Sequence, residues 1–411
     1  MPRAQSHAAI TLVMVTAEVF GMAGFSAFSA LLPVLIPQWS LPDSDAGLIS
    51  GIFYAGYLGA VPVLVSLTDR IPPRRVYLAC CVIAALANLG FAVAADGFWS
   101  AMLFRALAGV GLAGTYMPGL KLLTDHVQGP GQSRTLAFYT AGFGIGSSLS
   151  FLIPGLVTDW AGWRAAFWIG AAGPIIAMAL IVLFLPREDP RLHAPPDTHV
   201  LDFRPVLRCR AAMAFVLGYT VHNFELFVVR SWIVAYLAFA ASLRPDSAAG
   251  WWSAAALAAL FNIIGVPVSI FGNELALRFG RHRVIAAIML ASAAACVLAG
   301  LAPGWPFWVV VGVAALHAAL IIGESSALTA GAVGAAPQGY KGATMAVHSC
   351  LGFAGAFSGP VVFGFALQWA GGSQTESAWL AAFVLTGAVM LLGPLALRLD
   401  RPKPPAPAAA P

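Results

Sequence analysis

Long runs of apolar residues, separated by short polar segments, make up most of this chain. Each run has about 20 residues or more, the length that an α-helix needs to cross about 30 Å of hydrocarbon. The first run is too long for the hydrophobic core of a signal peptide, so we expect it to be retained as a helix. The pattern predicts twelve transmembrane helices, at residues 9–36, 46–67, 76–95, 99–120, 135–158, 164–185, 211–240, 250–275, 283–302, 306–333, 343–370 and 377–398.

A single long polar interruption divides these runs into six and six. It extends from Pro186 to Arg210 and is rich in proline and charge, as expected of a linker between two helical bundles. We therefore predict an all-α membrane protein with one six-helix bundle in residues 1–185 and another in residues 211–398, joined by a cytoplasmic linker at 186–210. The segment 399–411 has no hydrophobic periodicity and is predicted to be disordered.

Composition excludes an ordinary soluble domain. Charged residues form 9% of the chain and hydrophobic residues 60%, whereas soluble domains carry about 25% charged residues. The five cysteines have neither paired nor metal-like spacing, so the sequence supports no disulfide framework and no metal site. No catalytic signature or phosphate-binding loop stands out, so we expect neither an enzyme nor a bound cofactor.

The basic residues indicate how the helices are oriented in the bilayer. Of the 22 Lys and Arg residues, 18 fall in segments that lie on one side if the N-terminus is inside; two fall on the other side and two within spans. Positive charge accumulates on the cytoplasmic side of membrane proteins. We therefore expect both termini in the cytoplasm, and we attribute the net charge of +5 to topology rather than to nucleic-acid binding.

A basic turn occurs at matching places in the two predicted bundles, after spans 2 and 8. The first reads DRIPPRR, from Asp69 to Arg75, and the second reads RFGRHR, from Arg278 to Arg283. Such an internal repeat is the usual construction of secondary transporters. Span 4 also carries the pattern RxxxGxG, formed by Arg105, Gly109 and Gly111.

Together with the six-plus-six arrangement, these motifs resemble the major facilitator superfamily across nearly the whole chain. Two positions of the first turn depart from the family's pattern, because Val65 and Pro72 occupy the places of its usual glycines. The resemblance implies transport by alternating access and a monomer in a bacterial inner membrane. It also implies a cytoplasmic gate formed by an acidic residue and the nearby arginines, namely Asp69, Arg70, Arg74 and Arg75. Positive-inside topology alone would explain the arginines.

Ionisable residues inside the spans are the candidates for a functional site, because burying them in a bilayer is costly. Span 7 is the richest, and on a helix its residues Tyr219, His222, Asn223 and Arg230 fall on one broad face. Glu225 follows His222 by three positions, so the two could share a proton. The resemblance places spans 1, 4, 7 and 10 around a central cavity, which adds Glu18, Arg105, His317 and Glu324. The alternative is a set of internal ion pairs that serve only helix packing.

These residue types favour a proton-coupled transporter of a small organic or anionic solute. Histidine titrates near neutral pH and burial favours a protonated carboxyl group, so the glutamates and histidines could carry protons. An arginine keeps its proton and suits an anionic group of the substrate. Two alternatives remain open: a proton/drug antiporter in which Glu18 binds cations, and a membrane receptor or scaffold that transports nothing.

Overall fold

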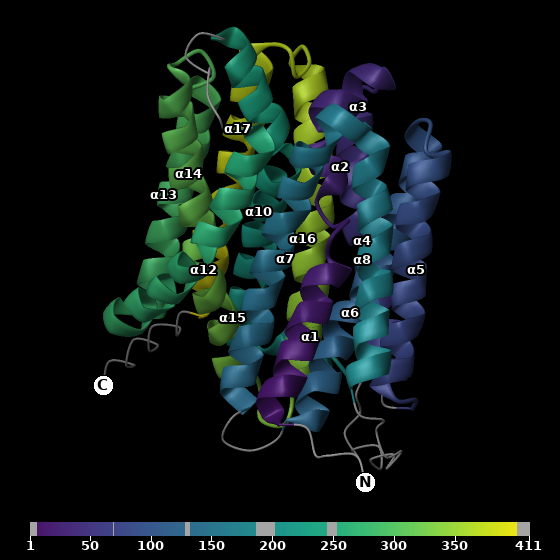
Figure 1. The fold of residues 1–411 in the computed structure, drawn as a ribbon. Helices are drawn as coiled ribbons and strands as arrows, with labels where there is room; N and C mark the ends of the chain where they lie inside the picture. The colour runs from purple at the N-terminus through teal and green to yellow at the C-terminus, as the bar shows by residue number, and fades with distance from the viewer. Residues whose placement is uncertain (1–5, 69, 128–131, 186–201, 245–252, 401–411) are drawn as a thin grey trace, which may run out of the picture.

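The fold is built from helices alone wherever the structure describes it. The computed structural model describes residues 6–68, 70–127, 132–185, 202–244 and 253–400 (Figure 1). Eleven of its helical segments are long and apolar enough to cross a membrane, and the shorter apolar helix at His7–Gly21 begins the predicted first span. The prediction of an all-α membrane protein is therefore confirmed. Most of the predicted linker and the end of the predicted tail lie outside the described residues.

The helices of the two predicted bundles follow one another with short connections. We call residues 6–185 the first half, whose helices are α1 (His7–Gly21), α2 (Ala27–Ala30), α3 (Leu32–Gln38), α4 (Asp43–Leu67), α5 (Pro73–Ala94), α6 (Phe98–His126), α7 (Gln132–Ala161) and α8 (Trp163–Phe184). Residues 202–400 form the second half, with α9 (Arg204–Arg208), α10 (Arg210–Leu243), α12 (Ala254–Phe279), α13 (Arg281–Leu301), α14 (Phe307–Gly323), α15 (Ser325–Gly334), α16 (Lys341–Trp369), α17 (Glu376–Met390), α18 (Leu392–Leu397) and η1 (Arg398–Asp400).

Two of the predicted spans that carry candidate residues are broken rather than continuous. The first span consists of α1, α2 and α3, with turns at residues 22–26. The tenth consists of α14 and α15, which meet at Glu324. A break inside a bilayer is tolerated only where protein groups satisfy the freed backbone. The side chains that hydrogen-bond the backbone at each break are therefore expected to be structural.

The two halves pack closely at the end where α4 begins and α16 ends, which is uppermost in Figure 1 and which we call the upper end. A Cβ atom at Gly47 of α4 would lie only 2.6 Å from the carbonyl oxygen of Pro360 in α16. Asp43 joins the halves by two hydrogen bonds: its amide donates to Gln368 Oε1 (2.9 Å), and its Oδ2 accepts from the amide of Ser373 (2.7 Å). This end of the molecule is closed.

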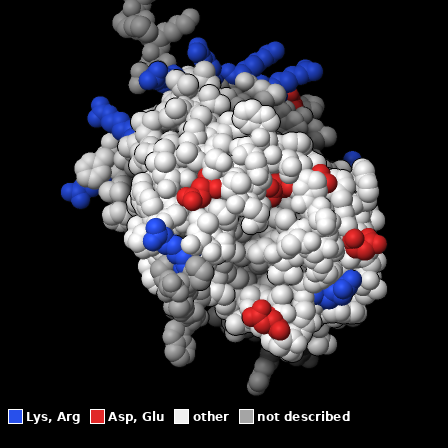
Figure 2. All heavy atoms as spheres, turned by 90° about the horizontal axis from the view of Figure 1, so that it is seen from above, with Lys and Arg blue, Asp and Glu red and all other residues white. Residues whose placement is uncertain are grey.

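The sides of the molecule suit a lipid environment. Large apolar side chains such as Leu12, Leu86 and Phe271 are exposed on the sides of the bundle. Seen from the upper end, Figure 2 shows scattered acidic side chains on an otherwise largely uncharged face, with most basic side chains at its rim. Apolar flanks are what a multi-pass membrane protein requires.

Candidate functional site

An aromatic cluster surrounds Arg230 where the two halves meet. The Arg230 guanidinium lies 5.4 Å from the ring centre of Phe227, 5.7 Å from that of Phe143 and 6.0 Å from that of Phe25. Phe143 belongs to α7 and Phe25 to the break in the first span, so both come from the opposite half. A guanidinium is attracted to the faces of aromatic rings within about 6 Å.

Arg230 has cation–π neighbours but no hydrogen-bond or ion-pair partner among the described residues, and its buried Nε is unsatisfied. The cavity that it lines with Asn262 and several apolar residues of α10, α12 and α14 has a volume of about 20 Å³. That volume suffices for one water molecule. The cavity is therefore too small for an organic solute in this conformation.

Arg105 has a different environment, because it donates a hydrogen bond to a backbone carbonyl group at the break in the first span. Its Nη1 donates to the carbonyl oxygen of Phe25 (3.3 Å), and its guanidinium lies 4.4 Å from the ring centre of Phe53. The freed amide of Ser26 donates to Ser150 Oγ of α7 (3.2 Å). The candidate from span 4 thus supports the backbone beside the aromatic cluster.

Glu18 is a buried carboxyl group with no hydrogen bond from any described residue. Its side chain is 5% exposed and lies between α1 and α7, where a Cβ atom at Gly142 would come within 2.6 Å of Glu18 Oε2. The glycine therefore makes room for the carboxyl group. An ionised carboxylate without a partner is expensive to bury, whereas the neutral acid is much less so.

His222 pairs with Glu324 rather than with Glu225, its expected neighbour on the same helix. The distance between His222 Nδ1 and Glu324 Oε1 is 3.2 Å, and both side chains are fully buried. Glu324 stands at the break between α14 and α15. His222 Nε2 and Glu324 Oε2 have no partner among the described residues, so the pair keeps one free polar atom on each side.

Glu225 forms its own pair with His317 of α14, with Oε1 2.8 Å from His317 Nε2. The same oxygen accepts hydrogen bonds from Ser292 Oγ (2.9 Å) and Cys296 Sγ (3.2 Å), both on α13. Two His–Glu pairs therefore lie inside the second half. The sequence predicted the residues but not this pairing, because the partners are on different helices.

Tyr219 and Asn223 face α16. A Cβ atom at Gly352 of α16 would lie 2.6 Å from an atom of each. The ring of Tyr219 stacks on that of His348, with ring centres 3.8 Å apart. The face that span 7 was predicted to present is thus divided: Tyr219 and Asn223 point to α16, Arg230 to the first half, and His222 to the break in the tenth span.

Comparison with known proteins agrees with this architecture. The sequence profile of the Major Facilitator Superfamily matches residues 14–273, more than half of the chain. The chain belongs to this superfamily.

Relatives with assigned names match about half of the chain. Protein spinster homolog 1 of Homo sapiens is 29% identical over 222 residues, which cover 51% of this chain and 42% of the human protein. The 3-(3-hydroxy-phenyl)propionate transporter of Escherichia coli is 30% identical over 209 residues, 48% of this chain and 50% of the relative. The matches thus span half or less of these relatives.

A solved structure extends the likeness in fold to nearly the whole chain. It is a bacterial homolog of the human lysosomal transporter Spinster in an inward-facing and occupied conformation, with a TM-score of 0.72. It covers 95% of this chain and 94% of its own at 16% identity, which establishes a shared fold.

The basic turn typical of the superfamily is only partly described. Asp69, the acidic member of the predicted gate, lies outside the described residues. Arg70 and Arg75 are exposed, and Arg74 donates from Nη2 to the carbonyl oxygens of Ile181 (3.1 Å) and Val182 (3.2 Å) at the end of α8. In this conformation Arg74 therefore caps a helix of its own half.

Several residues of the candidate site could not be selected from the sequence. Phe25, Phe143 and Phe227 look like ordinary membrane-core residues, and only their convergence on Arg230 distinguishes them. Cys296 and Ser292 are unremarkable in the chain and become notable only through their contacts with Glu225.

Proposed function

We propose that this chain is a secondary transporter of a small organic anion that carries a carboxylate on or near an aromatic ring. Arg230 is the observation that carries the proposal. Its guanidinium lies between the two halves with aromatic rings around it and its hydrogen-bonding capacity unused by the described residues. A guanidinium binds a carboxylate through paired hydrogen bonds, and the rings favour a planar apolar group beside it.

The relative from Escherichia coli supports the same substrate class. Its name specifies 3-(3-hydroxyphenyl)propionate, which joins a carboxylate to an aromatic ring. The two kinds of group around Arg230 match these two parts of such a molecule. We therefore place the substrate of this chain among aromatic carboxylates.

Proton coupling is assigned to Glu18 and to the pair formed by His222 and Glu324. These groups are buried, and both carboxyl groups keep at least one oxygen without a partner among the described residues. A carboxyl group in such a place can take up a proton in one conformation and release it in another. These titratable groups suit a proton gradient as the energy source.

Alternating access accounts for the closed upper end. Hydrogen bonds of Asp43 and the close approach at Gly47 hold the halves together there. Transport requires these contacts to break while contacts at the opposite end form.

We assign the opposite end to the cytoplasm of a bacterial inner membrane, because it carries the excess of basic residues. We expect the protein to act as a monomer.

The proposal is tested with purified protein in proteoliposomes under an imposed proton gradient. Internal pH is followed while 3-(3-hydroxyphenyl)propionate, benzoate, their neutral amides and lipophilic cations are added in turn. We expect proton movement with the carboxylates only. Arg230→Gln should abolish it, and Arg164→Gln should not, because Arg164 is exposed beside Trp163 at the upper end.

The unpartnered carboxyl group of Glu18 favours a second candidate, a proton/drug antiporter in which that residue binds a cation. Proton movement with lipophilic cations alone, unaffected by Arg230→Gln, would establish this candidate and contradict the first. No proton movement and no uptake of any labelled solute would contradict both and favour a receptor or scaffold.

A further inference from the structure

Three metal-binding side chains converge inside the second half, at a place that the transport proposal does not use. They are Glu225 of α10, Cys296 of α13 and His317 of α14, all essentially buried. Cys296 Sγ lies 3.2 Å from Glu225 Oε1 and 3.2 Å from His317 Nε2, and the last two atoms are 2.8 Å apart. Each atom is thus within reach of one common point.

The donor set matches the chemistry of Zn²⁺. This ion takes sulfur, nitrogen and oxygen ligands from Cys, His and Asp or Glu, usually in tetrahedral geometry. The charges also balance, because a thiolate and a carboxylate neutralise a divalent ion while the imidazole is neutral. A neutral complex avoids most of the cost of burying charge in a membrane interior.

We propose that Glu225, Cys296 and His317 form a binding site for a divalent metal ion of the Zn²⁺ class. In the structure the three atoms are linked by hydrogen bonds, and the ion would replace the shared protons. Ser292 donates a hydrogen bond to Glu225 Oε1 (2.9 Å), which orients the carboxylate as an outer partner of a metal ligand does. Glu225 Oε2 is buried and has no other described partner, so it is a further available ligand atom.

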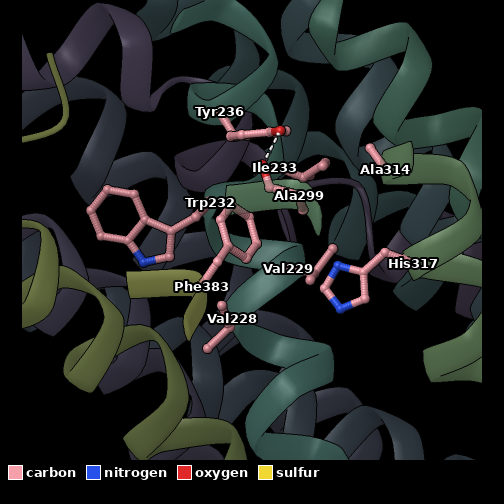
Figure 3. Close-up of a pocket in the computed structure, with 9 residues that line it drawn as sticks. All are labelled: Val228, Val229, Trp232, Ile233, Tyr236, Ala299, Ala314, His317 and Phe383. Atoms are coloured by element: carbon pink, nitrogen blue, oxygen red, sulfur yellow. Dashed lines mark hydrogen bonds between the residues drawn. The ribbon is translucent and has the colours of Figure 1, made fainter. Parts of the chain in front are cut away.

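The site has room to adjust. Ligand atoms bound to Zn²⁺ at about 2.0–2.3 Å lie about 3.3–3.7 Å from one another in a tetrahedron, so these atoms must move apart by several tenths of an ångström. A cavity of about 10 Å³ borders the ring of His317, between Val229, Ala314 and Phe383 (Figure 3). We infer that a small shift of this ring is the movement that separates the three donors.

The site would join three helices that are far apart in sequence. An ion held by α10, α13 and α14 stabilises the second half as a rigid body, because it binds only when all three helices are in place. This role is independent of the transported solute. It predicts a metal-dependent melting temperature even for a variant that does not transport, such as Arg230→Gln.

Cobalt(II) is the probe that tests the site, since it replaces zinc and a cobalt–thiolate bond gives a charge-transfer absorption in the near ultraviolet. The full chain is purified in detergent, freed of any affinity tag and stripped with a chelator, then titrated with Co²⁺. We expect one Co²⁺ per chain with the thiolate band, and a higher melting temperature. Zn²⁺ should displace the cobalt and remove the band.

Matched variants identify the ligands. Cys296→Ser should lose the thiolate band, whereas Cys350→Ser should keep it. Ser292→Ala should keep the band but weaken the affinity by about 10-fold, the usual cost of removing an outer partner. A wild-type protein that shows no thiolate band with Co²⁺ overturns the proposal without any variant. A band that persists in Cys296→Ser also overturns it.

Discussion

The two arginines inside the spans have different partners, which indicates that they serve different purposes. Arg105 donates from Nη1 to the carbonyl oxygen of Phe25 and packs on Phe53, although its buried Nε has no described partner. Arg230 has aromatic neighbours but no described acceptor. Because a buried donor without a partner lowers stability, its retention in a fold suggests a ligand that satisfies it. We therefore favour Arg230 over Arg105 as the residue that binds the proposed substrate.

Replacing Arg230 with lysine tests whether the shape of the guanidinium matters. Lysine keeps the charge but loses the planar pair of donors that matches a carboxylate. We expect the affinity for the substrate to fall about 10-fold or more, since hydrogen bonds to charged groups contribute about 1.5–3 kcal/mol. Binding is measured by isothermal titration with the carboxylate that the proteoliposome screen identifies. Arg164→Lys is the control, and equal affinities in the two variants would contradict the assignment.

A neutral replacement of Glu324 separates solute movement from proton movement. Glu324→Gln keeps the size of the side chain but cannot release a proton. We expect the variant to exchange labelled for unlabelled solute across the membrane and to lose accumulation driven by a proton gradient. Glu274→Gln, which changes an exposed glutamate of the same half, should retain both activities. Retained accumulation in Glu324→Gln would exclude Glu324 as the coupling residue.

At the scale of single elements, the broken first span is the feature that the sequence concealed. Residues 9–36 form one apolar run, which predicts one helix, yet the chain turns at residues 22–26. The groups that satisfy the break, Arg105 and Ser150, come from helices that are distant in sequence. Hydrophobicity is sufficient to predict the type of the elements and the approximate extent of the spans, because lipid imposes both. It carries no information about backbone partners supplied by other helices.

The hydroxyl group of Ser150 should matter more than that of its neighbour Ser148. Ser150 Oγ is the acceptor for the buried amide of Ser26, whereas Ser148 Oγ donates only to Gly144 of its own helix (2.9 Å). Ser150→Ala leaves that amide unsatisfied and should lower the free energy of unfolding by about 1–3 kcal/mol. Ser148→Ala should change it little. Unfolding is followed by circular dichroism during titration with a denaturing detergent, and equal losses would contradict the role of Ser150.

The sequence also did not show which residues of the candidate site meet across different helices. The sequence singled out the ionisable residues of spans 1, 4, 7 and 10 because charge in a bilayer is costly. Six of these candidates are buried in the structure, and Arg230 is half-buried. It predicted a pair between His222 and Glu225 from their spacing on one helix. The observed partners, Glu324 and His317, lie on other helices. Spacing within one helix specifies a face, and the packing of several helices decides which residues meet.

For the whole molecule, the closed upper end depends on small residues where α4 crosses α16. Gly47 allows the two backbones to approach so closely that a methyl group would overlap the carbonyl oxygen of Pro360. Small residues commonly permit such approaches between membrane helices. The closed state therefore requires a residue without a Cβ atom at position 47, whereas a state with an open upper end would not.

Adding one methyl group at Gly47 should open the upper end. Spin labels on cysteines that replace the exposed Trp99 and Trp369, one in each half, report the separation by double electron–electron resonance. We expect Gly47→Ala to shift the distance distribution toward longer values. Gly59→Ala, on the same helix with open space beside the glycine, should leave the distribution unchanged. Identical distributions in the two variants would show that this contact does not hold the upper end closed.

The interrupted first span also makes the two halves mechanically unequal. Its counterpart, the seventh span, is the single helix α10 of 34 residues, whereas the first consists of three short helical pieces. A continuous helix transmits a tilt along its whole length, whereas a broken helix allows its upper segment to tilt separately. We therefore expect the two halves to move by different amounts and in different ways. In the proposed alternating-access cycle, inward and outward opening would then have different activation barriers, and transport would proceed at different rates in the two directions.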